Sequence, residues 1–333
     1  RILFTPYQSF DALVNFLKAA GEDENVTEIS MTLYRLGSKS PVVEALINAA
    51  EAGKKVTAVI ELKASFDEER NFLWSEKLKK AGVDVIFGVS GLKTHAKCCI
   101  VSRNEEVGTK YYATVSTGNY NAGTARIYSD LSLFTADDRI CSDLRRLFSQ
   151  IKEDRISGGF ESLIVSPKDM EKQILELIER EADSNGHIIL KMNSLTDKTI
   201  INALYAASQK GVKIELCVRG ICMLRPGVEG LSENISVVSV VGRFLEHARV
   251  FYFEKSGKLY IGSPDMMPRN LHKRVEILCP VYDADCRSEI ERLLSIWLSD
   301  KVKGYSLDSA GRYFVSGKNG ISSQEQFISM MKQ

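Results

Sequence analysis

The sequence predicts an α/β protein of two related domains, each a mixed sheet flanked by helices, with one active site between them. Three observations support this prediction. A helical pattern followed by a short β-branched run is the dominant rhythm, this unit occurs twice, and each copy is followed by a histidine two residues before a base. With 333 residues, of which 44% are hydrophobic, the chain has enough material for about two domains.

The first helix-strand unit begins at residue 41. Apolar residues recur near helical spacing over residues 41–52, and Gly53 suits the C-terminal cap of such a helix. The run Val56-Thr57-Ala58-Val59-Ile60 then suits a buried strand. A helix that returns the chain to a buried strand is typical of α/β proteins.

The second unit repeats the first at an offset of 158 residues. Ala45-Leu46, Ala49, Gly53 and Lys55 match Ala203-Leu204, Ala207, Gly211 and Lys213. A strand-like run follows in both places. A boundary fits Gly158-Gly159, which divides the chain into residues 1–157 and 158–333. The polar tail from Asp300 carries one expected short helix near residues 324–331.

Each half also carries a histidine triplet, His95-Ala96-Lys97 in the first and His247-Ala248-Arg249 in the second. Small polar runs, residues 116–119 and 262–265, then close the next strand. We expect each histidine to open a strand, so that it shares one strand face with the base two residues later. Two such modules about a pseudo-twofold axis predict two imidazoles in one positively lined cleft.

This arrangement favours phosphoryl transfer. Imidazole is nucleophilic near neutral pH because its unperturbed pKa is about 6.5, and nearby Lys or Arg can neutralise phosphoryl oxygens. A single histidine at a strand edge is more often structural, but the repeat favours a functional reading for His95 and His247. His187 reads as a turn or surface residue and His272 as solvated, so neither receives a role.

Composition limits the partners and the location. The net charge of +1 argues against general nucleic-acid binding, so a polyanion would need a local basic channel. The seven cysteines lack CxxC spacing and read as reduced core residues. No apolar run approaches the roughly 18 residues of a membrane span, and no leader resembles a secretory signal. We expect a cytoplasmic protein without an integral membrane segment, which leaves peripheral membrane association open.

Longer stretches identify a family. The repeated half resembles the phospholipase D superfamily, and the whole chain is much more similar to the C-terminal catalytic domains of polyphosphate kinases. The segments that carry this resemblance span nearly the whole chain: residues 6–10, 32–35, 61–64, 66–69, 91–97, 117–121, 124–128, Val218-Arg219-Gly220, Leu245-Glu246-His247 and Met267-Pro268-Arg269-Asn270. The resemblance implies two phospholipase D-like domains and reversible transfer of the ATP γ-phosphate to inorganic polyphosphate.

By the same resemblance, His95 is the nucleophile that becomes phosphohistidine, and His247 faces it and contacts the nucleotide phosphates. Tyr128 bounds the adenine side of ATP, whereas Arg219 and Arg274 hold phosphate oxygens, as a guanidinium fork can. Lys97 and Arg249, the bases of the two triplets, belong to the same phosphate-binding group. The resemblance also implies Mg²⁺, ATP or ADP, polyphosphate and a homo-oligomer. Arg35 belongs to the magnesium region, as an outer-shell residue because guanidinium has no lone pair to offer.

One departure and two alternatives stay open. Many family members carry Arg where this chain has Ser65, and Lys63 or Arg70 are nearby substitutes. A phospholipase D-type phosphodiesterase is the first alternative, although Ser102 stands where that family has an acidic residue in the first half. A non-catalytic polyphosphate-binding fragment is the second. Reaction direction, polymer length and nucleotide preference are not fixed by the sequence.

Overall fold

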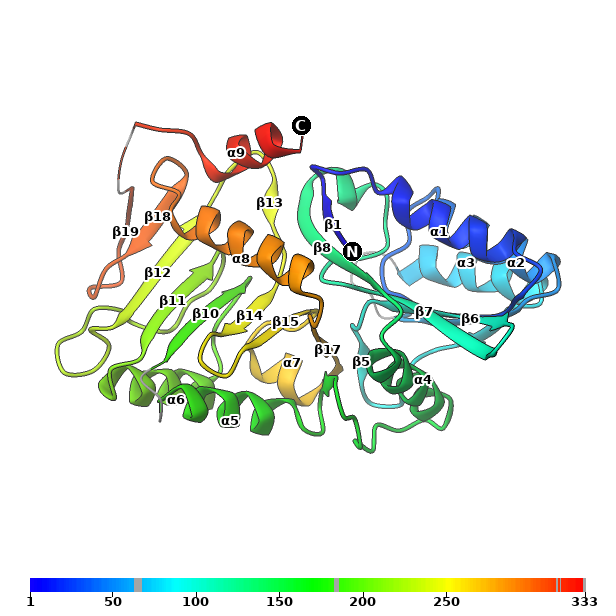
Figure 1. The fold of residues 1–333 in the computed structure, drawn as a ribbon, viewed down its shortest axis with the longest axis horizontal. Coiled ribbons are helices and arrows are strands. Elements are labelled where there is room, and N and C mark those ends of the chain that lie inside the picture. The colour runs from blue at the N-terminus through cyan, green and yellow to red at the C-terminus, as the bar shows by residue number, and fades with distance from the viewer. Residues whose placement is uncertain (63–67, 183–185, 316, 318, 332–333) are drawn as a thin grey trace.

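The computed structural model describes residues 1–62, 68–182, 186–315, 317 and 319–331, and it places two sheets side by side, each with helices on both faces (Figure 1). The first sheet has the order β1-β8-β7-β6-β2-β3-β4, with β13 added beside β8. The second sheet has the order β19-β18-β12-β11-β10-β14-β15-β17-β9. A third sheet has only β16 and β5. The predicted fold class, two related α/β units, is therefore confirmed.

The first half is an α/β unit with a mixed sheet. Helices α1, α2 and α3 enclose a core against one face of this sheet, and α4 covers the other. Its elements are β1 (Ile2–Thr5), α1 (Asp11–Glu22), β2 (Val26–Leu33), α2 (Pro41–Glu51), β3 (Lys55–Ile60), α3 (Glu68–Lys80), β4 (Asp84–Ile86), β5 (Lys93–Thr94), β6 (Cys98–Glu105), β7 (Gly108–Ser116), a 3-10 turn (Thr124–Arg126), β8 (Tyr128–Thr135) and α4 (Asp138–Lys152).

The second half repeats this plan with α5 and α6 on one face and α8 on the other. Its elements are β9 (Ile164–Val165), α5 (Met170–Ala182), β10 (His187–Met192), α6 (Lys198–Gln209), β11 (Lys213–Val218), β12 (Ile235–Val240), β13 (Leu245–Glu246), β14 (Val250–Phe253), β15 (Lys258–Gly262), α7 (Pro268–His272), β16 (Arg274–Val275), β17 (Ile277–Pro280), α8 (Ala284–Leu298), β18 (Gly304–Leu307), β19 (Tyr313–Val315) and α9 (Ser323–Met330).

The helix-strand repeat of the sequence is confirmed. Helix α2 begins at Pro41 after the Ser40 side chain, which accepts from the Val43 N–H, and α6 begins after Asp197, which caps it in the same way. Gly53 adopts a φ of 85° and Gly211 a φ of 91°, so both turns use a conformation that glycine favours. The strands that follow, β3 and β11, are parallel neighbours of β2 and β10.

The two halves pair with each other through short strands. Strand β13 of the second half pairs in parallel with β8 of the first, and β5 of the first half pairs in parallel with β16 of the second. One apolar core also runs through both halves, because residues of α4 and α8 belong to the same buried cluster. The contact between the halves is therefore built from backbone hydrogen bonds and shared packing. The division between residues 157 and 158 stays a prediction.

The tail is more regular than the sequence suggests. Strands β18 and β19 extend the second sheet by antiparallel pairing, whereas the expected short helix is confirmed as α9. All seven cysteines are free, and six of them are buried, as the prediction of reduced core residues requires. In the described parts of the chain, no helix has the length and apolar character needed to cross a membrane.

Candidate active site

His95 directly follows β5, which pairs with β16 of the second half. The backbone N–H groups of His95 and Ala96 both donate to the Val275 carbonyl, at 2.9 and 2.8 Å. The His95 ring is held by Glu276, whose Oε2 lies 2.8 Å from Nδ1. The Tyr34 ring packs edge-on against the imidazole, with centroids 4.8 Å apart. A residue of the second half therefore orients the histidine of the first.

His247 is held in the same way after β13, which pairs with β8 of the first half. Its N–H and that of Ala248 donate to the Ser129 carbonyl on β8, at 3.1 and 2.8 Å. Its Nδ1 lies 2.9 Å from both carboxylate oxygens of Asp130. The Tyr128 ring is tilted against the imidazole, with centroids 5.1 Å apart. The acid that orients each histidine thus comes from the other half of the chain.

The prediction that each histidine opens a strand is wrong. His95 and Lys97 lie in the connection between β5 and β6, and His247 and Arg249 lie between β13 and β14. The reason is that the N–H groups of each histidine and of the alanine after it donate to a carbonyl of the other half, so regular pairing starts only afterwards. Lys97 reaches back to donate to the His95 carbonyl, and its Nζ lies 5.0 Å above the Tyr34 ring.

The two histidines belong to one buried polar network. The Lys97 carbonyl accepts from the Ser116 N–H at 2.9 Å. The carbonyl of Thr117, the residue after Ser116, accepts from Arg249 Nη1 at 3.2 Å. The Thr117 hydroxyl donates to Asp130 Oδ1 at 2.6 Å. Asp130 in turn holds His247. Removal of one member would leave buried polar atoms of both halves without partners.

Burial decides the charge of both rings. Desolvation lowers the pKa of His95 to about 3 and that of His247 to about 4, although Glu276 and Asp130 act in the opposite direction. Burial by itself raises the pKa of Glu276, but His95 and Lys97 outweigh it and bring that pKa to about 2. Each ring is therefore neutral near pH 7. Since an ionised carboxylate can only accept, Nδ1 carries the proton and Nε2 has the lone pair.

The bases of the two triplets differ in their environment. Burial lowers the pKa of Lys97 well below its usual range, and the nearby Arg249 and Arg274 act in the same direction. Arg249 forms an ion pair with Asp265 at 3.2 Å, and its Nη1 lies 3.0 Å from His247 Nε2. The guanidinium is therefore anchored by a carboxylate, whereas the Lys97 amine contacts a carbonyl and an aromatic face.

The other predicted residues divide between the two histidines. Arg219 follows the carboxyl end of β11, as expected, and donates to the Asn193 side chain. Arg219 lies on the His247 side, because its partner Asn193 also donates to the His247 carbonyl, at 3.4 Å. Burial lowers the pKa of Arg219, and Arg249 adds to this shift. Arg274 lies 3.8 Å from Glu276 on the His95 side. Arg35 follows Tyr34, whose ring packs against His95, so the Arg35 backbone lies on this side too. Burial raises the pKa of Tyr34, and Arg274 and Arg35 counteract this shift.

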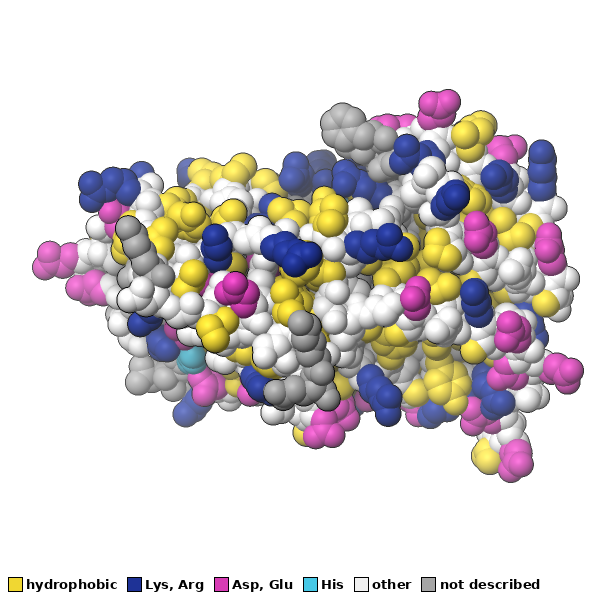
Figure 2. Space-filling view, turned by 90° about the horizontal axis from the view of Figure 1, so that it is seen from above, with side chains coloured by type: hydrophobic (Ala, Val, Ile, Leu, Met, Phe, Trp, Pro, Cys, Tyr) yellow, Lys and Arg dark blue, Asp and Glu magenta, His cyan; other side chains and the backbone are white. Residues whose placement is uncertain are grey.

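Figure 2 shows several Lys and Arg side chains along the middle of one face of the molecule. The carboxylates around the histidines are engaged, because Asp130, Glu276 and Asp265 hold His247, His95 and Arg249. The described residues of this site thus offer cations to phosphate oxygens and do not form a carboxylate cage for Mg²⁺. Ser65 and Lys63 lie outside the described residues.

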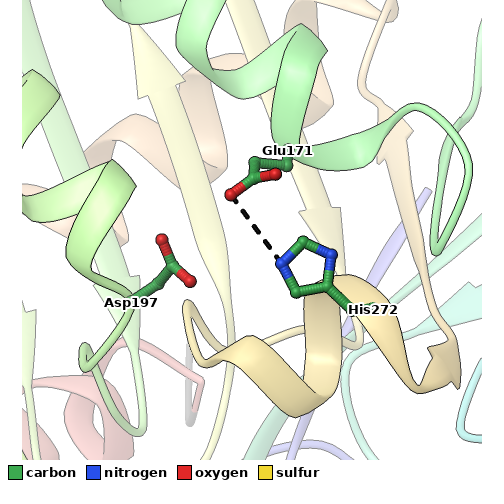
Figure 3. A group of neighbouring side chains, drawn as sticks. All are labelled: Glu171, Asp197 and His272. Carbon is green, nitrogen blue, oxygen red and sulfur yellow. Dashed lines mark ion pairs between the residues drawn. The ribbon is translucent and has the colours of Figure 1, made fainter.

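The remaining two histidines lie elsewhere. His187 is not a turn residue, because it begins β10, where its ring bridges Glu215 and Glu254 at 2.7 Å each. His272 is largely exposed, as expected, and lies 3.8 Å from Glu171 beside Asp197 (Figure 3). Asp197 already caps α6 through Oδ1, so this group has a structural explanation.

The sequence reading missed the orienting acids, Asp130 and Glu276. They are 146 residues apart, the same separation as Asn119 and Asp265 in the two small polar runs. This second offset, extended beyond those runs, is the signal that could have found them. Each acid also follows a predicted site residue by two positions, Tyr128 in one half and Arg274 in the other.

Comparisons with known proteins point to one family. Two family models match the chain, "Polyphosphate kinase C-terminal domain 1" over residues 1–157 and "Polyphosphate kinase C-terminal domain 2" over residues 163–326. The chain is 45% identical over 341 aligned residues to polyphosphate kinase 1 of Chlorobaculum tepidum, with 100% of this chain and 49% of that protein covered. The chain spans about half the length of the curated relatives it matches.

Solved structures give the same result. The polyphosphate kinase of Porphyromonas gingivalis superposes with a TM-score of 0.92 at 38% identity, over 100% of this chain and 52% of that one. The phosphatidylserine synthase of Haemophilus influenzae superposes with a TM-score of 0.63 at 10% identity, over 99% of this chain and 92% of that one. At that identity the second likeness shows a shared fold alone. The predicted architecture of two related α/β halves is confirmed by both superpositions.

Proposed function

Because the chain belongs to the polyphosphate kinase family, we propose that it transfers the terminal phosphoryl group of ATP to inorganic polyphosphate through a phosphohistidine at His95. The acceptor and the donor are both polyanions, so a site lined by Lys97, Arg249, Arg219 and Arg274 suits them. The covalent intermediate lets one site serve both, since phosphohistidine can return its group to ADP or pass it to a polymer end.

One observation carries this proposal. Among the described residues, no hydrogen bond is formed at His95 Nε2, while Nδ1 is held by Glu276. The lone pair of a neutral imidazole is therefore available for attack. The equivalent atom of His247 faces the Arg249 guanidinium at 3.0 Å. This difference favours His95 as the nucleophile and His247 as a ligand of the nucleotide phosphates.

The transfer consists of two in-line displacements. In the first, Nε2 of His95 forms a bond to the γ-phosphorus, and the bond to the bridging oxygen breaks, with its electron pair leaving on ADP. The ring gains positive charge, which the Glu276 carboxylate stabilises through the Nδ1 proton. In the second, a terminal oxygen of polyphosphate attacks the same phosphorus, and the N–P bond breaks to restore neutral His95.

The cations supply electrostatic stabilisation. Lys97 is desolvated, so an incoming phosphoryl group favours its charged form and gains a strong partner. Arg274 would hold phosphate beside His95, and Arg219 with Arg249 beside His247, while Tyr128 bounds the nucleotide next to that ring. Mg²⁺ would arrive on the nucleotide and shield its phosphates, with Arg35 acting through phosphate or water. The homo-oligomer and the cytoplasmic location stay predictions.

The test is a labelling experiment with matched histidine variants. The intact protein is incubated with ATP labelled in the γ-phosphate, and acid-labile label on protein is measured together with ADP and polymer. We expect His95→Gln to remove the label and His272→Gln, a change at an exposed ring, to retain it. Release of alcohol from a diester without transfer from ATP would favour a phosphodiesterase instead. Salt-dependent polyphosphate binding with neither label nor ADP would favour a non-catalytic module.

A further inference from the structure

The segment that enters the site at His247 is held from outside by one side chain of the tail. Gln324, in the first turn of α9, accepts from Phe244 N at 3.0 Å through its Oε1. Its Nε2 donates to the Phe244 carbonyl and to Glu246 Oε1, both at 2.8 Å. The amide thus pairs with residue 244 as a neighbouring strand would, and it reaches Glu246, the residue before His247.

The same segment is held from inside by β8 and β10. Glu246 is buried, and its second oxygen, Oε2, accepts from the Ser129 hydroxyl at 3.0 Å and lies 3.2 Å from Lys191 Nζ. Ser129 is the residue whose carbonyl accepts from His247 N. Both Glu246 oxygens are therefore used, one by the tail and one by the frame that positions the histidine.

Two further observations show that Gln324 is built into this place. A Cβ on Gly242 would lie 2.5 Å from Gln324 Oε1, so the amide occupies the space that a larger residue at 242 would need. Helix α9 is anchored independently of that contact. Asp300 accepts hydrogen bonds from Ser323. Ser322 and Glu325 form a capping box at the start of the helix. The Phe327 ring packs edge-on against Phe4 and Trp297.

We infer that Gln324 is a positioning residue that fixes His247 against Asp130 and Tyr128 by clamping the 244–246 segment. This inference rests on the proposed function of the site. The β8–β13 pairing aligns Leu245 with Tyr128 and Glu246 with Ser129, so a shift of the clamped segment moves His247 relative to both partners. His95 depends on the separate β5–β16 pairing. We therefore expect the main effect of Gln324 on the His247 side.

The test compares Gln324→Met with Ser322→Ala in the intact protein. Methionine keeps the length and packing of the side chain but cannot hydrogen-bond to residues 244 and 246 in the same way. Ser322→Ala removes the α9 cap and leaves the amide, so it controls for a merely looser helix. We expect Gln324→Met to lower kcat on the order of tenfold with a small change in KM for ATP, and Ser322→Ala to stay within about twofold.

A second readout does not depend on turnover. Nitrogen-15 signals of the His247 ring should report one Nδ1–H tautomer in the unchanged protein and in Ser322→Ala, and a mixture in Gln324→Met, while the His95 signals stay unchanged. This readout separates the two proposals, because it tests the clamp even if the protein forms no phosphohistidine. Unchanged His247 signals in Gln324→Met, or the same loss in Ser322→Ala, would overturn the inference.

Gln324→Glu provides a check that does not rely on packing. The carboxylate would face Glu246 and could not donate, and like charge raises its pKa. Protonation restores a donor, so we expect kcat relative to the unchanged protein to recover as the pH falls. A purely structural role predicts a defect that does not recover. If this variant shows no pH-dependent recovery, the donor role of Gln324 is wrong.

Discussion

The two histidine sites are copies of one frame with different cations. In both, the ring Nδ1 faces a carboxylate of the other half, the backbone N–H donates to a carbonyl of the other half, and an aromatic ring lies alongside. At His95 the base is Lys97, bound to a carbonyl. At His247 it is Arg249, anchored by Asp265 and directed at Nε2.

This difference shows how a duplicated frame can serve two roles. At His247, the guanidinium donates to the Nε2 lone pair of the ring, and its planar set of N–H groups can bind phosphate. An ammonium that leaves Nε2 uncovered allows the other ring to attack. In the proposed function, this difference in base, with Asn119 standing where the second half has Asp265, separates the proposed nucleophile from the proposed ligand.

The largest expected effect comes from removal of an orienting acid. Glu276→Gln keeps the shape but lets the amide donate to Nδ1, which would move the ring proton to Nε2 and block attack. We expect phosphohistidine formation to fall on the order of 10⁴-fold, as loss of a tautomer-setting acid does elsewhere. Rapid-quench labelling measures this rate.

Asp130→Asn is the matched change on the other side. Because His247 is proposed to bind phosphate, this variant should weaken ATP binding more than it slows the first chemical step. Equal losses of labelling rate in Glu276→Gln and Asp130→Asn would show that the two rings do not have separate roles.

A smaller effect is expected at the base that differs. Arg249→Lys loses the two-point contact with Asp265 and uncovers His247 Nε2. We expect ATP affinity to fall about tenfold, because lysine cannot make the bidentate, charge-assisted contact of a guanidinium with phosphate. The labelling rate at saturating ATP should stay nearly unchanged. Equilibrium binding and labelling together measure both quantities. A variant that labels slowly at saturating ATP would assign Arg249 to the chemical step instead.

A third histidine gives a stability contrast outside the site. The hydrogen bond that the His187 ring donates to Glu215 raises the pKa of His187, and the same bond lowers the pKa of Glu215 to about 2. The pair therefore stabilises the fold below the unfolded histidine pKa of about 6.5, and this contribution is lost as the pH rises through the higher folded value. His187→Gln should cost up to about 1 kcal/mol near pH 6 and less near pH 9. Denaturant melts at the two pH values measure it.

The smallest expected change is in the titration of the two site histidines. Since burial lowers the pKa of His95 to about 3 and of His247 to about 4, both rings should stay neutral from pH 8 to pH 5. His187, whose pKa is raised, should take up its proton above pH 6.5 in the same experiment. Ring nitrogen shifts measure all of these. A midpoint near 6.5 for His95 would contradict the desolvated environment.

Local pattern predicted much of this fold and part of the site. The repeat at 158 residues and the two triplets predicted two related halves, and both are present. The strands β5, β13 and β16, which pair across the two halves, have two residues each, too few to show any periodicity. For the same reason the sequence could not show that His95 and His247 precede their strands. The acid that holds each ring comes from the other half, so no spacing within one triplet indicates Glu276 or Asp130.

The most direct measurement of the central claim is the position of the phosphoryl group on the protein. After brief exposure to ATP and an alkaline quench, phosphorus NMR and peptide mapping distinguish the two ring nitrogens and the two histidines. We predict phosphate on Nε2 of His95 and none on His247. Phosphate on His247, or on Nδ1 of His95, would contradict the roles assigned to the acids Glu276 and Asp130 and to the bases Lys97 and Arg249.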